Sequence, residues 1–194
     1  MNVDSSNWCG QYFVPTLPNN AVYWRVTRAR FQAREHGGDP GITRVQVRTA
    51  TGSGLPTTVV LDQSSLYETT LNSNYAWNDA YFTNAMQLDP SNGACIVFRW
   101  VNDTDSCDVL HRVLSLALVN GSKSVSTSNG GNSWSGNALL QIPLQIYGKT
   151  ATKDPDTYSY YLSGVRLTMR SGALAAARVN AGIRVLSEPQ VAGP

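Results

Sequence analysis

One short acidic segment of the chain carries side chains of the type that binds calcium. Asp103, Asp105 and Asp108 place three carboxylates within six residues. Calcium takes about six to eight oxygen ligands, and this spacing resembles the first part of an EF-hand loop. The segment lacks the later bidentate glutamate and the glycine of that loop. Two hypotheses therefore stand, a calcium site and a solvated hairpin loop, and the missing ligands favour the loop.

Aromatic residues supply a second candidate site, because exposed rings can stack against sugars. The chain has five tryptophans and nine tyrosines, and most are expected in the core, where aromatic side chains bury large areas. Residues 74–81 (NYAWNDAY) instead surround Trp77 with polar neighbours. Trp77, with Tyr75 and Tyr81, is therefore the best candidate for an exposed platform that binds carbohydrate.

The stretch TSNGGNSW, residues 127–134, resembles the Asp-box S-x-D-G-G-x-T-W, a β-hairpin turn known from sialidase propellers. Gly130 and Gly131 are predicted to take positive φ, Asn129 to bond nearby backbone, and Trp134 to pack beneath the turn. A propeller needs several blades with their own repeats, whereas this chain has 194 residues and one such stretch. We interpret the stretch as a structural turn.

The sequence carries no recognisable catalytic signature. His36 and His111 are the two histidines. His36 lies with Glu35 and Asp39 in a glycine-rich loop, a composition that is more typical of a turn than of a catalytic site. G-x-S-x-G, H-E-x-x-H and P-loop patterns are absent from the sequence. A glycoside hydrolase needs two facing carboxylates, which spacing in a β-sandwich sequence cannot establish. No catalytic residue is assigned, and an enzyme is the third hypothesis.

Composition limits the classes of partner. Charged residues make up 14% and the formal net charge is +2, which argues against nucleic acid and anionic membranes. The arginines are scattered along predicted strands, and we interpret them as solvated strand faces. No apolar run of about 18 residues occurs, so no membrane-spanning helix is predicted. The three cysteines, Cys9, Cys95 and Cys107, are odd in number, and a Cys95–Cys107 disulfide is left open.

Alternating apolar residues predict strands along most of the chain. In residues 21–34 the apolar phase shifts near Thr27, which predicts a bulge. The two phases are Val22, Trp24 and Val26, then Ala29, Phe31 and Ala33. Residues 95–101 form a continuous apolar run, typical of a central strand that is covered on both faces. Pro143 lies on the outward phase of another alternating segment, which indicates an edge strand.

These patterns predict an all-β protein, a jelly-roll β-sandwich over residues 5–148 with a C-terminal β-hairpin appendage. A polar linker is expected at 149–157 and the hairpin at 158–187. Alternation in residues 165–169 and 179–185 favours that hairpin, although alanine and leucine after Ser171 leave a helix as the alternative. Two strands alone are barely stable, so the hairpin is expected to pack on the sandwich, or to pair with a partner outside this chain.

Two resemblances to known families follow from these stretches. The segments WRVTRARFQAR, VQVRTA, VLDQSSLYE, GACIVFRW and STSNGGNSW, in that order, resemble extracellular jelly-roll domains of the concanavalin-like and carbohydrate-binding type. The tail YYLSGVRLTMRSGALAAARVNAGIRVLSEPQV is similar to the C-terminal ends of bacterial pilin-like and pseudopilin-like proteins, particularly large ones from planctomycetes. The second resemblance implies a hydrophobic N-terminal helix that anchors the protein and packs it into a filament, and this sequence contains no such helix.

The resulting expectation is a non-enzymatic structural or adhesive protein, extracellular or periplasmic, that forms the soluble head of a pilin- or pseudopilin-like subunit. A carbohydrate-binding, lectin-like module is the alternative, and a glycoside hydrolase is the third hypothesis. Expected partners are other pilin-like subunits or a glycan, and not nucleic acid. Apart from the calcium hypothesis, no cofactor is expected. Anchorage would come from an N-terminal helix outside this sequence.

Overall fold

The computed structural model describes the backbone of residues 1–37, 41–102, 107–115, 121–153, 157–162, 165–170, 177–178 and 184–185. Side chains are described for residues 1–37, 41–101, 107–115 and 121–153. The chain divides into a larger unit, Met1–Leu17 with Val22–Ala151, and a smaller one, Pro18–Ala21 with Thr152–Pro194. The division after residue 151 falls inside the segment 149–157 that was predicted as a linker.

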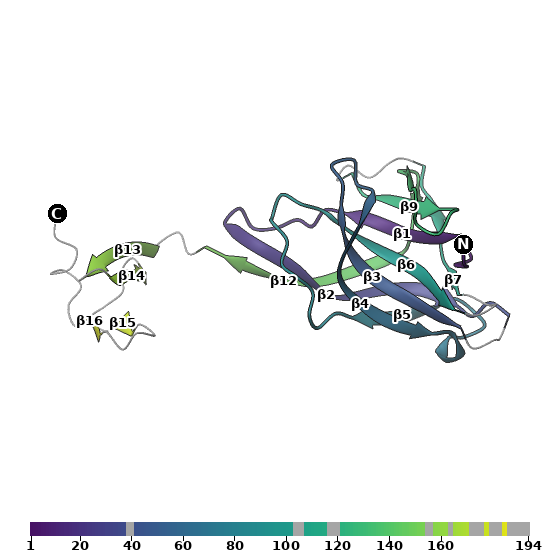
Figure 1. Cartoon of the computed structure of the whole chain (residues 1–194), viewed down its shortest axis with the longest axis horizontal. Coiled ribbons are helices and arrows are strands. Elements are labelled where there is room, and N and C mark those ends of the chain that lie inside the picture. The colour runs from purple at the N-terminus through teal and green to yellow at the C-terminus, as the bar shows by residue number, and fades with distance from the viewer. Residues whose placement is uncertain are drawn as a thin grey trace. The chain divides into compact units, whose positions relative to one another are not determined.

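The larger unit is built from antiparallel β-sheets, which confirms the all-β prediction for the described residues (Figure 1). Its six-stranded sheet has the order β10-β9-β1-β6-β3-β4. These strands are β1 (Trp8–Phe13), β3 (Ile42–Ala50), β4 (Pro56–Tyr67), β6 (Ala94–Asn102), β9 (Lys123–Thr127) and β10 (Ser135–Asn137). A short 3-10 helix, Glu68–Thr70, follows β4.

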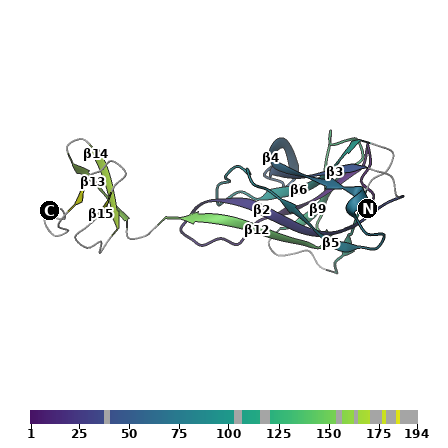
Figure 2. The same ribbon diagram turned by 90° about the horizontal axis from the view of Figure 1, so that it is seen from below.

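A four-stranded sheet lies on the other side of the core. It has the order β12-β2-β5, and β7 pairs with one end of β2. Its strands are β2 (Ala21–Arg34), β5 (Ala76–Tyr81), β7 (Asp108–Val109) and β12 (Leu144–Thr152). A separate two-stranded pair joins β8 (Arg112–Val113) to β11 (Leu140–Gln141). Figure 2 shows β2, β5 and β12 along one side of the larger unit and β3, β4 and β6 along the other.

Aromatic pairs join the two sheets across the core. Phe31 of β2 packs edge-to-face on Phe98 of β6, with ring centroids 4.7 Å apart. Phe13 of β1 packs in the same way on Trp24 of β2 at 5.9 Å. Burial of each such side chain contributes about 1.5–3 kcal/mol, and edge-to-face geometry adds about 0.5–1.5 kcal/mol per pair. The arrangement of the larger unit is therefore sandwich-like.

The long strand β2 changes its inward phase where the sequence predicted it. Val26 and Ala29 are both buried, and Thr27 and Arg28 between them are only partly buried. The shift keeps both halves of the strand facing the core, although Val22 at its start is 53% exposed. β6 also behaves as predicted for a central strand, because it pairs with β1 and β3 and its residues 94–98 are fully buried.

Pro143 interrupts a segment that alternation had predicted as one strand. β11 ends at Gln141 and β12 begins at Leu144, so Pro143 lies between them, where its missing backbone N–H breaks no ladder hydrogen bond. β12 is the outer strand in the order β12-β2-β5, which agrees with the predicted edge position.

All three cysteines are buried and free, which answers the question that the sequence left open. In the β6 ladders Cys95 lies opposite Tyr12 of β1 and Arg48 of β3. Burial raises the pKa of both Cys95 and Cys107 to about 12, and it raises the pKa of Cys9 as well. The thiols therefore stay protonated at neutral pH.

The smaller unit contains two β-hairpin pairs among its described residues. β13 (Thr157–Leu162) pairs with β14 (Val165–Arg170), and β15 (Ala177–Arg178) pairs with β16 (Arg184–Val185). Strand character at 165–170 is confirmed, but β14 pairs with the strand before it instead of the one after it. Leu162 pairs with Val165, so only two residues separate the partners, and such local pairing is the easiest to form. Packing of this tail on the larger unit stays a prediction.

The turn at residues 127–134 has the predicted positive φ values and side-chain hydrogen bonds, but the ring beneath Gly131 is that of Trp8 instead of Trp134. Gly130 and Gly131 have φ of 65° and 87°. The Thr127 hydroxyl donates to Asn129 Oδ1 at 2.8 Å, and the Gly131 N–H donates to Thr127 Oγ1 at 3.2 Å. The Trp134 ring packs on Trp8, 6.5 Å between centroids. The motif is a local fold element, as interpreted from the sequence.

The requirement of this turn for glycine at position 131 can be tested by substitution. A Cβ at Gly131 would lie 2.5 Å from the Trp8 ring, whereas a Cβ at Gly121, which also has positive φ at 73°, would meet no described atom within 4 Å. We expect Gly131→Ala to lower the free energy of unfolding by about 2–4 kcal/mol, and Gly121→Ala by only the backbone cost of about 1–2 kcal/mol. Urea denaturation measures both, and equal losses would show that the contact with Trp8 has no role.

Candidate ligand-binding face

The outward side of the four-stranded sheet gathers arginine and aromatic side chains. Because Ala29, Phe31 and Ala33 point into the core, the alternate residues of β2 point outward. Neighbouring strands add exposed rings, with exposed fractions between 37% and 60%. We call this surface the aromatic–arginine face, and it consists of Arg28, Arg30, Arg34, Tyr75, Trp77, Tyr81 and Tyr147.

Each arginine of this face lies against an aromatic ring. The guanidinium carbon of Arg28 is 3.7 Å from the centre of the Tyr147 ring. The corresponding distances are 5.6 Å from Arg30 to Trp77 and 4.9 Å from Arg34 to Tyr75. Cation–π attraction acts within about 6 Å, so all three stacks qualify. Rings and guanidinium groups therefore alternate along about 20 Å of β2 between residues 28 and 34.

Strand register explains how these residues meet. In the β2–β5 ladder Arg28 lies opposite Tyr81, Arg30 opposite Asp79, and Gln32 opposite Trp77. Directly opposed side chains on one face are about 4.5–5.5 Å apart at Cβ, and diagonal neighbours remain within reach of long side chains. Arg30 therefore reaches Trp77 diagonally, and Arg28 has Tyr81 on one side and Tyr147 of β12 on the other.

Two carboxylates are paired with arginines of this face. Asp79 lies 3.7 Å from Arg28. Asp108 accepts hydrogen bonds from Arg34 at 2.8 and 2.9 Å, and His36 is 3.4 Å away. Burial of Asp108 opposes its charged form, but the hydrogen bonds from Arg34 and His36 outweigh it and lower the pKa of the carboxyl group. Asp108 is therefore ionised at neutral pH and forms its ion pair with Arg34.

Arg30 differs from its neighbours in having no acidic partner. Among the described residues no carboxylate lies within ion-pair distance of its guanidinium group, and its Nε is buried without a hydrogen-bond acceptor. A buried donor without an acceptor costs about 1–3 kcal/mol. Arg30 is thus the arginine of this face whose positive charge is not offset by a carboxylate of any described residue.

The sequence identified some residues of this face and missed others. Tyr75, Trp77 and Tyr81, predicted as a ligand-binding set, lie on it together, with Trp77 41% exposed. The arginines had been interpreted as scattered and solvated, whereas three of them stack on rings. Tyr147 was not identified. The sequence pattern that could have identified this face is the recurrence of arginine at residues 28, 30 and 34, which all lie on the outward-facing side of β2.

The predicted calcium site is only partly within the described residues. Asp103 and Asp105 lie outside them, and Asp108 is held by Arg34. In the part of the chain that the structure describes, no group of three His, Cys, Asp or Glu side chains could hold a metal ion. The calcium hypothesis for this segment stays a prediction.

Neither histidine forms a catalytic pair with another residue in the described parts of the chain. His111 is partly buried, its Nδ1 lies 3.2 Å from the Val109 carbonyl oxygen, and burial lowers its pKa. Its Nε2 is buried without a hydrogen-bond partner among the described residues. His36 lies beside the Asp108 carboxylate that Arg34 already holds. Asp39, the third residue of the glycine-rich loop, lies outside the described residues.

A second arginine–tryptophan cluster lies on the six-stranded sheet, and two of its three members are buried. Arg48 and Arg99 lie 5.9 and 5.2 Å from the centre of the Trp8 ring. Arg48 is only 7% exposed and donates to the Gln46 side chain and to the Thr57 carbonyl. Trp8 is 9% exposed. Arg48 and Trp8 are therefore part of the interior, whereas Arg99 is exposed at its edge.

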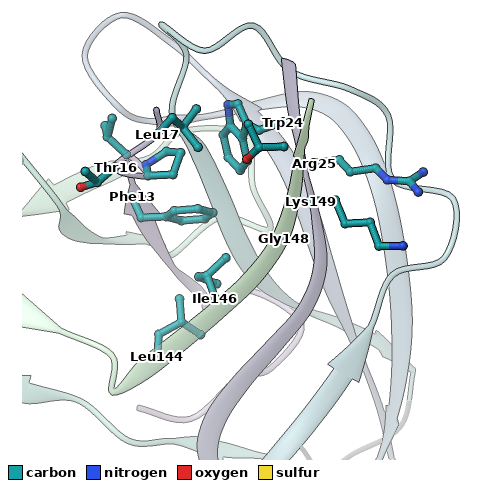
Figure 3. Close-up of a pocket in the computed structure, with 12 residues that line it drawn as sticks. Phe13, Thr16, Leu17, Trp24, Arg25, Leu144, Ile146, Gly148 and Lys149 are labelled. Carbon is teal, nitrogen blue, oxygen red and sulfur yellow. The ribbon is translucent and has the colours of Figure 1, made fainter. Parts of the chain in front are cut away.

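A cavity of about 440 Å³ opens at the end of the sandwich-like unit between β1, β2 and β12. Its apolar lining includes Phe13, Trp24 and Ile146. Figure 3 shows these side chains on one side of β2 and β12, while Arg25 and Lys149 point to the other side. The two cations thus lie on the same outer side as the aromatic–arginine face, although both are also among the residues that line the cavity.

Comparison with protein-family models, with curated proteins and with solved structures gives no match. The resemblances to jelly-roll domains and to pilin-like tails therefore remain hypotheses. Among the described residues, no helix has the length and hydrophobicity needed to cross a membrane.

The Arg34–Asp108 pair makes a pH-dependent prediction. Asp108→Asn keeps the side-chain shape and removes the charge, so we expect a loss of about 1.5–3 kcal/mol in the free energy of unfolding at pH 7. The folded-state pKa of Asp108 is lowered, so its contribution is complete above the unfolded-state value of about 4 and is lost as pH falls through the folded-state value. Urea denaturation from pH 7 to pH 3 should therefore show the gap between wild type and variant closing.

Asp79→Asn is the matched control, because Asp79 pairs with Arg28 at the longer distance of 3.7 Å and both side chains are 28% exposed. Exposed pairs contribute about 0–1 kcal/mol, so this variant should lose less. A gap for Asp108→Asn that is independent of pH, or equal to that of Asp79→Asn, would contradict the account of the pair.

Proposed function

We propose that this chain is a non-enzymatic adhesive protein, extracellular or periplasmic, that binds a polysaccharide through its aromatic–arginine face. The observation that carries the proposal is the set of four exposed rings on one sheet face, Tyr75, Trp77, Tyr81 and Tyr147. Aromatic rings offer flat apolar surface, and nearby polar groups fix the orientation of a ligand by hydrogen bonds. An extended row of such groups suits a polymer better than a small molecule.

The acidic residues at this face favour binding over hydrolysis. Glycoside hydrolases use one carboxyl group with a raised pKa as the acid and a second as base or nucleophile. Here Asp79 is paired with Arg28, and Asp108 has a lowered pKa beside Arg34. Both carboxylates serve to hold arginines in place, which is the role expected in a binding surface.

We propose a jelly-roll type of sandwich for the larger unit. Its support is the repeated crossing of the chain from one sheet to the other. β1 and β3 lie in the six-stranded sheet and β2 in the four-stranded sheet, and the chain crosses again at β4–β5, β5–β6 and β6–β7. Such crossings characterise double-sheet jelly rolls, in contrast to a meander of sequential hairpins.

We also propose the pilin- or pseudopilin-like subunit as the setting of this head. Its support is the resemblance of the C-terminal tail, together with the separate β-hairpin pairs of the smaller unit. The native gene's sequence upstream of Met1 tests this setting. A type III signal followed by an apolar helix would support it, and an ordinary signal peptide with a catalytic domain would favour a binding module of an enzyme.

Replacement of one ring tests the binding function. We expect Trp77→Ala to weaken retention by polysaccharide at least about tenfold, or about 1.4 kcal/mol, since it removes the largest ring of the face. The matched control is Tyr67→Ala, because Tyr67 is 54% exposed on β4 of the other sheet. Affinity gel electrophoresis against a panel of soluble polysaccharides measures both variants, and thermal melting confirms that both fold.

Equal retention of Trp77→Ala and Tyr67→Ala would show that the face does not bind the polysaccharide. Failure of the wild-type chain to be retained by any member of the panel would rule out the proposed function.

A further inference from the structure

The four-stranded sheet carries more positive than negative side chains. Its outward surface is where these charges lie, because the alternate residues of β2 fill the core. The cations of its strands are Arg25, Arg28, Arg30, Arg34 and Lys149, and the anions are Asp79 and Asp108. The whole chain has a net charge of only +2, so this sheet concentrates positive charge that composition alone did not reveal.

Ion pairing leaves three of these cations without a carboxylate. Asp79 pairs with Arg28 and Asp108 with Arg34. Among the described residues, no carboxylate lies within 4 Å of the charged groups of Arg25, Arg30 or Lys149. Arg30 lies between the two paired arginines, and Arg25 and Lys149 lie side by side near one end of β2 (Figure 3). The unpaired charges therefore form a row along the strand.

The guanidinium group of Arg30 indicates which chemical group of a ligand would bind there. A guanidinium group has five donors in one plane and binds carboxylate, sulfate or phosphate oxygens with two parallel hydrogen bonds. No hydrogen bond from Arg30 to a described residue occurs, and its Nε is shielded from solvent. Its stack on Trp77, at 5.6 Å, holds the group in place. An anion on a sugar that stacks at Trp77 would lie beside this guanidinium.

We infer that the aromatic–arginine face binds an acidic polysaccharide, a chain of sugar rings that carry carboxylate or sulfate groups. The rings of Trp77, Tyr81 and Tyr147 stack against sugars, and Arg30, with Arg25 and Lys149, pairs with the acidic groups. The unpaired charges on β2, at residues 25 and 30, extend about 17 Å along the strand, and the aromatic–arginine face continues to residue 34, which suits an extended chain. This inference rests on the proposed function and specifies the ligand of the same face.

A matched pair of polysaccharides tests the charge directly. Polygalacturonate and its fully methyl-esterified form share one backbone and differ in the carboxylate, and dextran sulfate and dextran differ in the sulfate. At about 50 mM salt we expect the acidic member of at least one pair to bind about tenfold or more tightly than its neutral partner. The affinity should fall as salt is raised, because ion pairs are screened. The pair that shows the difference identifies the acidic group.

Two variants that each remove one positive charge show where on the protein the acidic groups bind. Arg30→Gln should weaken binding of the acidic member about tenfold and reduce its dependence on salt. Arg112→Gln is the control, because Arg112 is exposed on β8 and outside the four-stranded sheet, and it should change binding less than about twofold. Thermal melting of both variants confirms that they fold, and binding is measured by isothermal titration calorimetry on the full chain.

Several outcomes would overturn the inference, and they separate it from the proposed function. Equal binding of acidic and neutral members, lost in Trp77→Ala, would refute the acidic ligand and leave polysaccharide binding intact. Equal weakening by Arg30→Gln and Arg112→Gln would show general attraction between opposite charges instead of a site. Absence of binding to every member of both pairs would overturn the inference and the proposed function together.

Discussion

The alternation of side chains within each half of β2 is the constraint on which both the interior and the proposed binding face depend. Successive side chains of a strand point to opposite sides of the sheet, so a shift of one residue would exchange them. Phe31 faces Phe98 in the core, and Arg30 next to it faces outward against Trp77. The change of phase at Thr27 preserves this division, because Val26 and Ala29 both remain buried. Core packing thereby fixes where the arginines are displayed.

The stacks of the aromatic–arginine face prepare it for binding. A free arginine side chain loses about 2 kcal/mol of rotamer entropy when it is immobilised. Stacking on Tyr147, Trp77 and Tyr75 restricts the three guanidinium groups before any ligand arrives, so less entropy remains to be lost on binding. Arg28 and Arg34 are held further by carboxylates, whereas Arg30 has its stack and no ion pair with any residue that the structure describes. The same arrangement thus orders the face and leaves charge for a ligand.

Local patterns predicted the parts of this protein that local physics determines. The turn at Gly130 and Gly131, the buried run of β6 and the exposure of Trp77 all follow from a few neighbouring residues. The pairing of strands that are distant in the sequence could not be predicted from local patterns, because the packing of whole sheets sets the register. The ion pair between Arg34 and Asp108, 74 residues apart, carries no local signal. The stacks of arginine on rings from β5 and β12 were missed for the same reason.

The central claim, that the outer face of the four-stranded sheet is the binding face, is tested most directly by the indole N–H signals of the five tryptophans in a proton–nitrogen NMR spectrum. Trp77 lies on this face, Trp24 is buried and donates to the Asp89 carbonyl, and Trp8 packs on Trp134 at the other sheet. Trp77→Phe assigns the first signal. Titration with an acidic oligosaccharide should shift the Trp77 signal and leave that of Trp24 unchanged. Shifts confined to Trp8 and Trp134, with Trp77 unaffected, would contradict the claim.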